Sequence, residues 1–538
     1  MANCIFVETG QCGNQLGFSL LDTLYAHLAP SEELYYETYL DAYFRTPING
    51  GTPVARSVCL DTEPKVINDC LLNAERGGLW RIDPKSCAYR HGGAGNNWAL
   101  GYEMGSGEFL QTSIDMIGRE LEQCDYAPSL VFMHSLAGGT GSGLGTRITE
   151  SCEDQFPHST RLNVAIAPYH FGEVVVQHYN AVLCLSKVAA ASHAVLIFEN
   201  EIAQMLCRTM RCVDKPSLAQ LNETIASNLC PIFLPKYDHH RGQRRRTDLH
   251  DDLAHLCCHP GQKFLDIKVT PQTSDKSVAY TYDSWSTLVK TIQQMQLSGA
   301  ASERDIRANL KFALELGSGV GQVGSPTFSV LSNVRSRAND MSPVGGIKAM
   351  GVGATAPPLS PDNRGGSAAP SVIHSFASVV TLHGAEAADA ADTLRASVGG
   401  SSSSASASTF ESADSSPSTR SARRLQALKE QRKGPEHGEL RLHDLYMKSH
   451  SPLHSLQGGC AVQVASSPQL LNGYQRATSV LCNSQAVLPL LQRATREGAR
   501  LFKERAYLHQ YSTYGIGEED FQDSFRSLGS AIRSYMQC

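Results

Sequence analysis

The stretch Ala137-Gly138-Gly139-Thr140-Gly141-Ser142-Gly143-Leu144-Gly145 follows an apolar run at residues 130–134 (LVFMH). Five glycines in eight residues let the backbone approach a ligand closely, and the N–H groups of the loop and of the helix behind it can bind an anion. Thr140 and Ser142 add hydroxyl groups where phosphate oxygens would lie. The chain has neither the Gly-Lys-Ser/Thr of a Walker loop nor a GxGxxG fingerprint after its first predicted strand. This stretch therefore predicts a phosphate-binding loop of another kind.

Three more loops with polar or glycine residues precede it. Residues 10–15 (GQCGNQ) close the first predicted strand and open a helix, and residues 61–64 (DTEP) place two carboxylates on one side of a loop. Carboxylates beside a phosphate-binding loop would repel the bound phosphate unless a hard cation lay between the two groups. The pair of carboxylates therefore implies Mg²⁺, often held through water. Residues 93–99 (GAGNNWA) offer amides that can donate to a terminal phosphate. Alone, each of these loops would also fit an ordinary turn.

The first 210 residues alternate short β-branched or aromatic runs with helical periodicity. This pattern predicts βαβ units with a mostly parallel sheet, whose ligands bind at the strand ends. A helix should begin near Pro216, because proline is favoured in a first turn and leucine or isoleucine then recurs every three or four residues. The predicted strands span residues 4–7, 54–60, 129–134, 161–167 and 193–199.

The later part of the chain changes character. From about residue 264 the pattern predicts strands and turns up to 334, and then Gly, Ala, Pro and Ser dominate. Such a composition cannot offset its ordering entropy, so residues 336–440 are predicted to form a mostly disordered insertion, with one folded strand at 371–383. A basic stretch at 420–433 could bind an acidic partner, although a solvated helix face is the commoner explanation. Two helices, at 488–507 and 518–535, should finish the chain.

Composition limits the classes of protein that fit. A chain of 538 residues is too long for one ordinary core, and a net charge of −5 gives no basic field to recruit nucleic acid. No apolar run approaches the ~18 residues that span a bilayer, and the N-terminus lacks a secretory leader. The 16 cysteines contain no CxxC pair, which favours reduced thiols in the cytoplasm. Even Cys257, Cys258 and His259 fit buried thiols better than a metal site.

The order of GQCGNQ, DTEP, AGNNWA and GGTGSGLG resembles the tubulin superfamily over the whole N-terminal region, with weaker similarity up to the last helix. Residues 172–180 (GEVVVQHYN) and 507–528 (YLHQYSTYGIGEEDFQDSFRSL) resemble its delta-type members, which are associated with centrioles and basal bodies. The resemblance implies a tubulin-like α/β fold in which a Rossmann-like parallel sheet forms the GTPase domain. The implied divisions are a GTP-binding domain (1–214), a core helix (215–235), a mixed α/β second domain with the insertion (236–475) and C-terminal helices (476–538).

The resemblance also implies a site for GTP and Mg²⁺. Gln11 and Cys12 would lie near the phosphates and the metal, Glu63 near Mg²⁺, Asp61 beside the terminal phosphate, and Asn96 at the γ-phosphate. The residues implied to hold the phosphate chain are Ser135, Ala137, Gly138, Gly139, Thr140, Gly141, Ser142 and Gly143.

Four further positions match the sugar and base contacts of the family. Glu173 and Gln177 would contact the ribose, and Asn200 and Asn222 would recognise guanine, because an amide both donates and accepts hydrogen bonds. Gln177 stands where common tubulins carry Glu. Leu218 replaces an aromatic residue that stacks on the base, which should weaken binding.

A loop at residues 248–255 (DLHDDLAH) matches the one that completes the next subunit's nucleotide site in tubulins. Asp252 matches its structural aspartate, and His255 falls where alpha-type chains carry the glutamate that positions the attacking water. A neutral histidine could orient water, but the carboxylate is expected to be missing.

The resemblance implies a GTP-binding structural component of specialised microtubules in centrioles and basal bodies, needed for microtubule-based processes and for cilium or flagellum assembly. Its partners would be other tubulin chains, through longitudinal contacts coupled to the nucleotide, and centriolar or basal-body proteins. It would lie in the cytoplasm and cytoskeleton, without nucleic-acid or membrane partners. Two alternatives stay open: a weak GTPase that a partner subunit activates, and a soluble tubulin-binding adaptor that does not polymerise.

Overall fold

The computed structural model describes residues 3–28, 36–47, 51–170, 172, 174–240, 243–281, 283–306, 373, 375–384, 386–398 and 462–537. These residues belong to one unit, Met1–Ile306 with Ile373–Cys538. The predicted disorder at 336–372 and 399–440 and the basic stretch at 420–433 lie outside the described residues. Among the helices that are described, none combines the length and the apolar character that crossing a bilayer requires.

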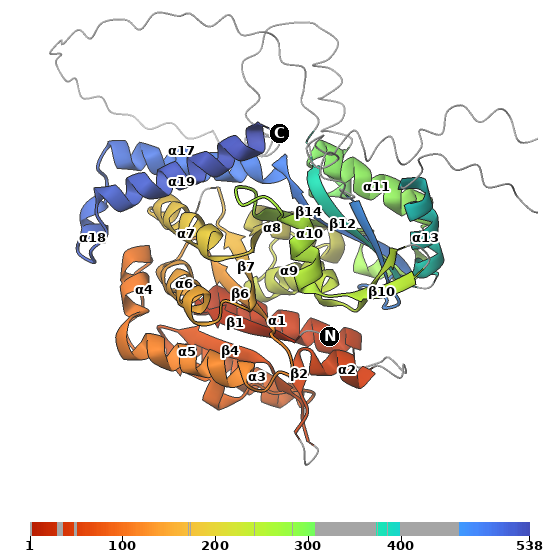
Figure 1. The fold of residues 1–538 in the computed structure, drawn as a ribbon, viewed down its shortest axis with the longest axis horizontal. Helices are drawn as coiled ribbons and strands as arrows, with labels where there is room; N and C mark the ends of the chain where they lie inside the picture. The colour runs from red at the N-terminus through yellow and green to blue at the C-terminus, as the bar shows by residue number, and fades with distance from the viewer. Residues whose placement is uncertain are drawn as a thin grey trace, which may run out of the picture. The chain divides into compact units, whose positions relative to one another are not determined.

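A parallel sheet forms the N-terminal half of the unit. Its strands run in the order β8-β7-β6-β1-β4-β5, all parallel, and β1, β6 and β7 are buried along almost their whole length because helices cover both faces. The predicted α/β architecture is confirmed (Figure 1). The strands are β1 (Cys4–Thr9), β4 (Ser57–Asp61), β5 (Cys87–Tyr89), β6 (Ser129–Ser135), β7 (Thr160–Ala167) and β8 (Ala194–Glu199), with β2 (Phe44–Arg45) and β3 (Val54–Ala55) paired separately.

The helix predicted to begin near Pro216 is α9 (Leu218–Phe233). Ser217 caps it in a capping box with Gln220, and its buried side includes Leu221 and Ile225. It packs against α1 (Gly10–Leu28) within one hydrophobic core. The other helices of this half are α2 (Tyr36–Asp41), α3 (Pro64–Gly77), α4 (Trp98–Met104), α5 (Gly107–Leu121), α6 (Gly145–Gln155), α7 (Gln177–Ala191) and α8 (Asn200–Arg211).

The sheet continues without a break across the predicted domain boundary at residue 214. β11 (Phe264–Thr270) pairs in parallel with β8 through Phe264 and Leu265, and antiparallel with β14 (Arg476–Ser484), giving a 12-stranded sheet. The order beyond β14 is β12-β13-β9-β10, comprising β12 (Ser375–Gly384), β13 (Val462–Ser467), β9 (Lys236–His240) and β10 (Gln243–Thr247).

Two predictions for this half need correction. The region from residue 264 was expected to hold only strands and turns, but α11 (Trp285–Ser298) forms there, capped by Ser284 and buried through Leu288 and Ile292. The strand expected at 371–383 is confirmed as β12, yet the helix α13 (Ala387–Val398) follows it inside the segment assigned to the insertion. Its alanine-rich sequence lies between stretches dominated by Gly, Ala, Pro and Ser, so composition alone does not distinguish it from them. The first helix after β10 is α10 (Leu249–Leu256).

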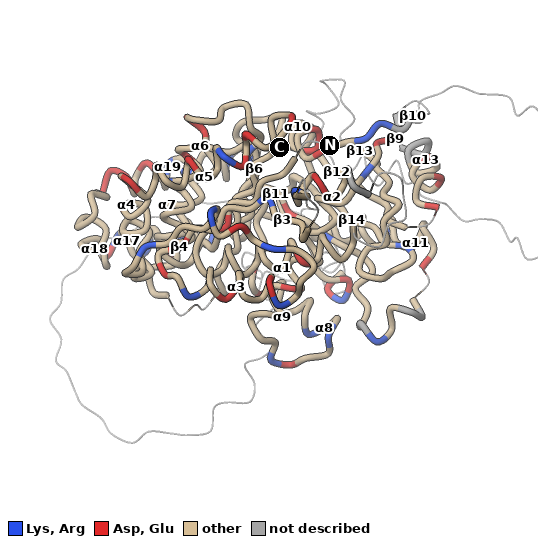
Figure 2. The backbone as a smooth tube through the Cα atoms, turned by 90° about the horizontal axis from the view of Figure 1, so that it is seen from below, with Lys and Arg blue, Asp and Glu red and all other residues tan. Residues whose placement is uncertain are grey.

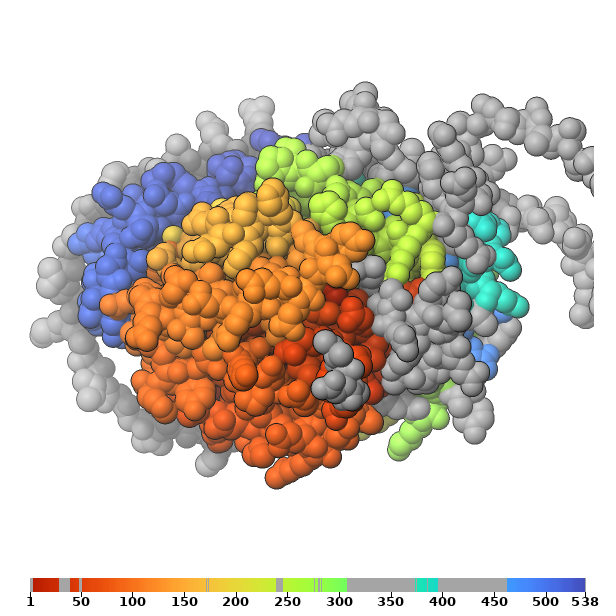
Figure 3. Space-filling view, turned by 60° about the horizontal axis from the view of Figure 1, so that its bottom comes forward, coloured from red at the N-terminus to blue at the C-terminus, as the bar shows by residue number. Residues whose placement is uncertain are grey.

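Three C-terminal helices cover α7. α17 (Leu488–Lys503) and α19 (Glu518–Met536) lie side by side against it, with α18 (Leu508–Ser512) between them in sequence (Figure 1). α17 ends earlier than the predicted residue 507, because Arg505 and Tyr507 adopt positive φ angles of 50° and 61°. Figure 3 shows these helices in blue beside the orange N-terminal half. Basic and acidic residues are interspersed along the described backbone (Figure 2).

Candidate functional site

The predicted phosphate loops follow neighbouring parallel strands, so they meet at one edge of the sheet. The loops after β1 and β6 are in close contact: a β-carbon built on Gly10 would lie 2.9 Å from the backbone nitrogen of Gly141. Gly10 also has a φ of +73°, which favours glycine. The hydroxyl groups of Thr62 and Thr140 are 2.6 Å apart, which joins the loop after β4 to the glycine loop. The structure therefore brings three of the four predicted segments together directly.

The glycines of the loop after β6 serve two purposes. β-carbons on Gly139 and Gly143 would lie 2.6 Å from the Ala94 carbonyl oxygen and 2.1 Å from the Trp98 carbonyl oxygen, so these two glycines allow the fourth predicted segment, residues 93–99, to pack against the loop. A β-carbon on Gly138 would meet only the side-chain oxygen of Asn96, at 3.8 Å. Gly138 is thus the half-exposed glycine that faces the Asn96 side chain.

The hydroxyl groups of this loop differ from the prediction. Ser142 is fully buried and donates to the Gly138 carbonyl oxygen, so its hydroxyl braces the loop instead of facing a ligand. Ser135 Oγ accepts a hydrogen bond from the Ala137 N–H at 3.1 Å. Thr140 stays half-exposed and opens a π-helical turn, η2 (Thr140–Leu144), that leads into α6.

The carboxylates after β4 have different environments. Asp61 is buried and accepts a hydrogen bond from the Thr62 N–H at 2.7 Å, and burial raises its pKa to about 6. Glu63 is exposed at the start of α3 and lies against Gly93. A buried carboxylate whose charged form is disfavoured, beside an exposed one, fits a hard divalent cation that would restore the charge.

The first turn of α1 supplies the next two predicted residues. Gln11 is exposed, and Cys12 is half-buried with a pKa that burial raises to about 12. The Cys12 thiol is therefore protonated at neutral pH. Asn14, fully buried below them, donates to the carbonyl oxygens of Gly10 and Leu60 and so ties α1 to β4.

The predicted base and sugar contacts come from separate elements. Asn200 begins α8 and Asn222 lies in the second turn of α9, both half-exposed, on two helices that pack together. Leu218 is 63% exposed at the start of α9. Gln177 departs from the predicted ribose contact: it is buried and its Nε2 donates to the Tyr169 carbonyl oxygen at 3.0 Å. Glu173 lies outside the described residues.

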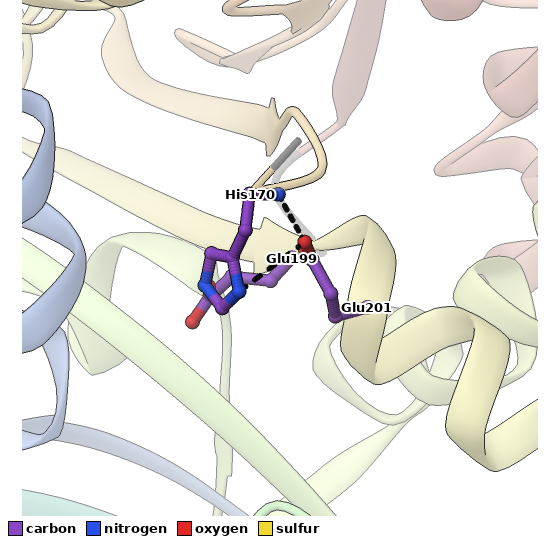
Figure 4. Close-up of side chains that lie close together, drawn as sticks. All are labelled: His170, Glu199 and Glu201. Carbon is purple, nitrogen blue, oxygen red and sulfur yellow. Dashed lines mark hydrogen bonds and ion pairs between the residues drawn. The ribbon is translucent and has the colours of Figure 1, made fainter. Parts of the chain in front are cut away.

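A cluster that the sequence did not predict lies beside Asn200. His170, Glu199 and Glu201 offer ligand atoms within 4.8 Å of one another, as a metal site would (Figure 4). However, Arg493 in α17 donates to Glu199 Oε2 at 3.1 Å, and the His170 backbone N–H donates to a Glu201 oxygen. Burial and Arg493 also lower the pKa of His170, so its imidazole is neutral at pH 7. These contacts tether the loop after β7 to the start of α8 and to α17.

Asn180 is the main residue of the site that the sequence did not single out. It is fully buried in α7, and its Nδ2 donates to the carbonyl oxygens of Asn96 at 2.8 Å and Ala137 at 2.7 Å. Its Oδ1 accepts from the Trp98 N–H at 3.0 Å and from the Tyr511 hydroxyl at 2.6 Å. An asparagine among buried apolar neighbours in a helix was the available signal, because a buried amide must find partners for all its polar atoms.

The predicted subunit-contact loop forms α10 from its cap at Asp248 to His255, and the first turn of this helix holds carboxylates. Asp252 is fully buried against the Lys236 ammonium, facing the protein interior. Asp248 caps the helix and Asp251 is half-exposed in its first turn, one turn before His255. The capping box, in which the Asp251 N–H donates to the Asp248 side chain at 3.1 Å, fixes where the helix begins and thus which of its side chains face inward.

Known proteins are similar to this chain in sequence. Residues 3–208 match the model of the Tubulin/FtsZ family, GTPase domain. The chain is 30% identical to the tubulin delta chain of Macaca fascicularis and to that of Homo sapiens, over 99% of this chain and 99% of each relative. It is also 29% identical to the tubulin beta-1 chain of Chondrus crispus, over 51% of this chain and 61% of that protein.

Proposed function

The chain belongs to the tubulin family, and on that basis we propose that it is a GTP-binding delta-type tubulin, a structural component of the specialised microtubules of centrioles and basal bodies. The observation that carries the GTP site is the contact among the loops after β1, β4 and β6, with residues 93–99 packed against them. The similarity to tubulin delta chains along the whole chain supports the delta-type assignment.

In this proposal the backbone of the glycine loop holds the phosphate chain, with Ala137, Gly138 and Thr140 as its half-exposed members. Asn96 contacts the γ-phosphate from across the site. Glu63 lies near Mg²⁺ and Asp61 lies beside the terminal phosphate, and the cation neutralises the charge between carboxylates and phosphates.

The remaining contacts of the proposed site select the base. Asn200 and Asn222 read the edge of guanine, which presents both donors and acceptors. Leu218 gives an apolar contact without stacking.

The nucleotide itself is the first test. The protein is purified without added nucleotide and denatured, and the released nucleotide is identified by chromatography, with Thr140→Ala and Asn200→Ala as site variants. We expect near-stoichiometric GTP that both variants lose. A wild-type protein that releases no nucleotide and takes up no added GTP would refute the site.

The cellular part of the proposal has a separate test. A tagged protein should resist detergent extraction and colocalise with basal bodies, and its depletion should shorten or remove cilia. Persistent recovery in the detergent-soluble fraction, bound to another tubulin, would instead identify the soluble adaptor.

A second candidate is a GTPase activity completed between subunits. The half-exposed carboxylate of Asp251 at the start of α10 favours it, because a carboxylate there could position water for the neighbouring subunit's nucleotide. Asp251→Asn should lower phosphate release from mixed assemblies with other tubulins. Asp214→Asn, at an exposed aspartate outside α10, is the control. Equal rates for the wild type and Asp251→Asn would eliminate this role.

A further inference from the structure

Two residues of α18 are hydrogen-bonded to the phosphate-loop region from a distance in sequence. The Tyr511 hydroxyl donates to Asn180 Oδ1 at 2.6 Å, across a separation of 331 residues. The neighbouring Gln510 accepts, through its carbonyl oxygen, a hydrogen bond from Asn97 Nδ2 at 2.9 Å. Asn180 in turn donates to both loops, at Asn96 and Ala137. A continuous set of hydrogen bonds therefore runs from the two loops to α18.

The bond between Tyr511 and Asn180 lies where water cannot replace it. Asn180 and Tyr511 are each 0% exposed, and burial raises the pKa of the Tyr511 hydroxyl far above its usual range. The Tyr511 ring packs edge-on against Phe521 of α19, with centroids 5.2 Å apart. Moving either loop must therefore shift α18 and α19 or leave a buried polar group without its partner, which is costly.

We propose that Asn180 and Tyr511 are positioning residues that couple the terminal phosphate of the bound nucleotide to the position of α18 and α19. The coupling rests on the proposed GTP site, in which Asn96 contacts the γ-phosphate. A γ-phosphate that fixes Asn96 also fixes its carbonyl oxygen, and with it the amide of Asn180. GDP lacks that contact, so the two nucleotides differ in how firmly they hold α18. Because coupling is reciprocal, a partner that binds α18 and α19 changes the preference for GTP over GDP.

The test removes one hydroxyl group. Affinities of GTP and GDP are measured by titration calorimetry for the wild type and Tyr511→Phe. The affinity for GTP should fall about five-fold and that for GDP should hardly change, because one neutral buried hydrogen bond is lost from the GTP-bound arrangement.

Tyr179→Phe is the matched control. Tyr179 precedes Asn180 in α7 and packs on the Tyr511 ring, with centroids 5.5 Å apart, but its buried hydroxyl has no hydrogen-bond partner among the residues that the structure describes. Its removal should leave the ratio of GTP to GDP affinity unchanged. Equal changes in the two variants, or no change in Tyr511→Phe, would overturn the coupling.

Hydrogen exchange can distinguish the coupling from a purely structural role of Tyr511, because a structural role would change amide protection equally with GTP and GDP. Amides of residues 508–536 should be more protected with a non-hydrolysable GTP analogue than with GDP in the wild type, and Tyr511→Phe should lose this difference. Equal protection with both nucleotides in the wild type would overturn the coupling while leaving the GTP site intact. Failure to bind either nucleotide would overturn the site and the coupling together.

Discussion

The two ends of the proposed nucleotide site are built in different ways. The phosphate end consists of backbone and glycines in close contact, as between Gly10 and Gly141, and is braced by the buried amide of Asn180. The base end consists of side chains from α8 and α9, including an exposed Leu218, while Gln177 is turned toward its own loop. Phosphate binding is therefore expected to depend on the shape of the backbone, which a β-carbon at a closely packed glycine would disturb. Base recognition depends on side chains that can change one at a time.

Gly143→Ala should have the largest effect. Its β-carbon would lie 2.1 Å from the Trp98 carbonyl oxygen, so the backbone must shift, and the free energy of unfolding should fall by about 3 kcal/mol. Denaturant titration and nucleotide content would measure the loss. Gly138→Ala is the matched control, because its β-carbon would lie 3.8 Å from Asn96 Oδ1, an ordinary contact. This variant should keep the stability of the wild type while binding nucleotide less tightly. Unchanged stability in Gly143→Ala would show that the phosphate end tolerates change as the base end does.

Asn200→Ala tests the base end. It should lower the affinity for GTP by about 10- to 100-fold, because a buried hydrogen-bonding edge of the base loses its partner. The affinity for ATP should hardly change, and neither should the melting temperature. Calorimetric titration with both nucleotides checks this. An equal loss for GTP and ATP would mean that Asn200 supports the phosphates and that the two ends are not separate.

Asp61 should make binding at the phosphate end depend on pH. Its folded pKa of about 6 lies above the ordinary 3.8, so its contribution to stability is present below pH 3.8 and is lost as pH rises through 6. Without Mg²⁺, the ionised carboxylate repels phosphate, so GTP affinity should rise about five-fold from pH 7.5 to 5.5. Asp61→Asn should remove the Asp61-linked part of this rise. A slope that survives in Asp61→Asn would assign the titration to another group.

Leu218→Tyr should have the smallest effect, and it is a gain. An aromatic ring at this exposed position should stack on the base and raise GTP affinity about three-fold without changing stability. Fluorescence titration would detect it. Leu72→Tyr, at an exposed leucine of α3, should change nothing. An equal gain in both variants would point to a nonspecific effect of the ring.

The same contrast explains what the sequence could predict. The phosphate loops could be predicted because each is a short motif after a strand, and parallel strands bring such ends together. The contact between Asn180 and Tyr511 joins residues 331 apart and leaves no local pattern. The buried ion pair of Asp252 with Lys236 agrees with the structural role expected for this aspartate, but the sequence could not show its partner, which lies on β9. The helix α11 was missed because its capping serine lies within a region of strand-like composition.

The pairing of β8 with β11 has a consequence for synthesis of the chain. β8 ends at Glu199, but its outer edge is covered only after Phe264 and Leu265 have been synthesised. The apolar face of α7 is covered later still, by α17 and α19. A nascent chain therefore leaves the ribosome with an open hydrophobic strand edge, the kind of surface that aggregates or engages chaperones. A fragment that stops at residue 214 should scatter light in solution, and a monodisperse fragment would contradict this order of events.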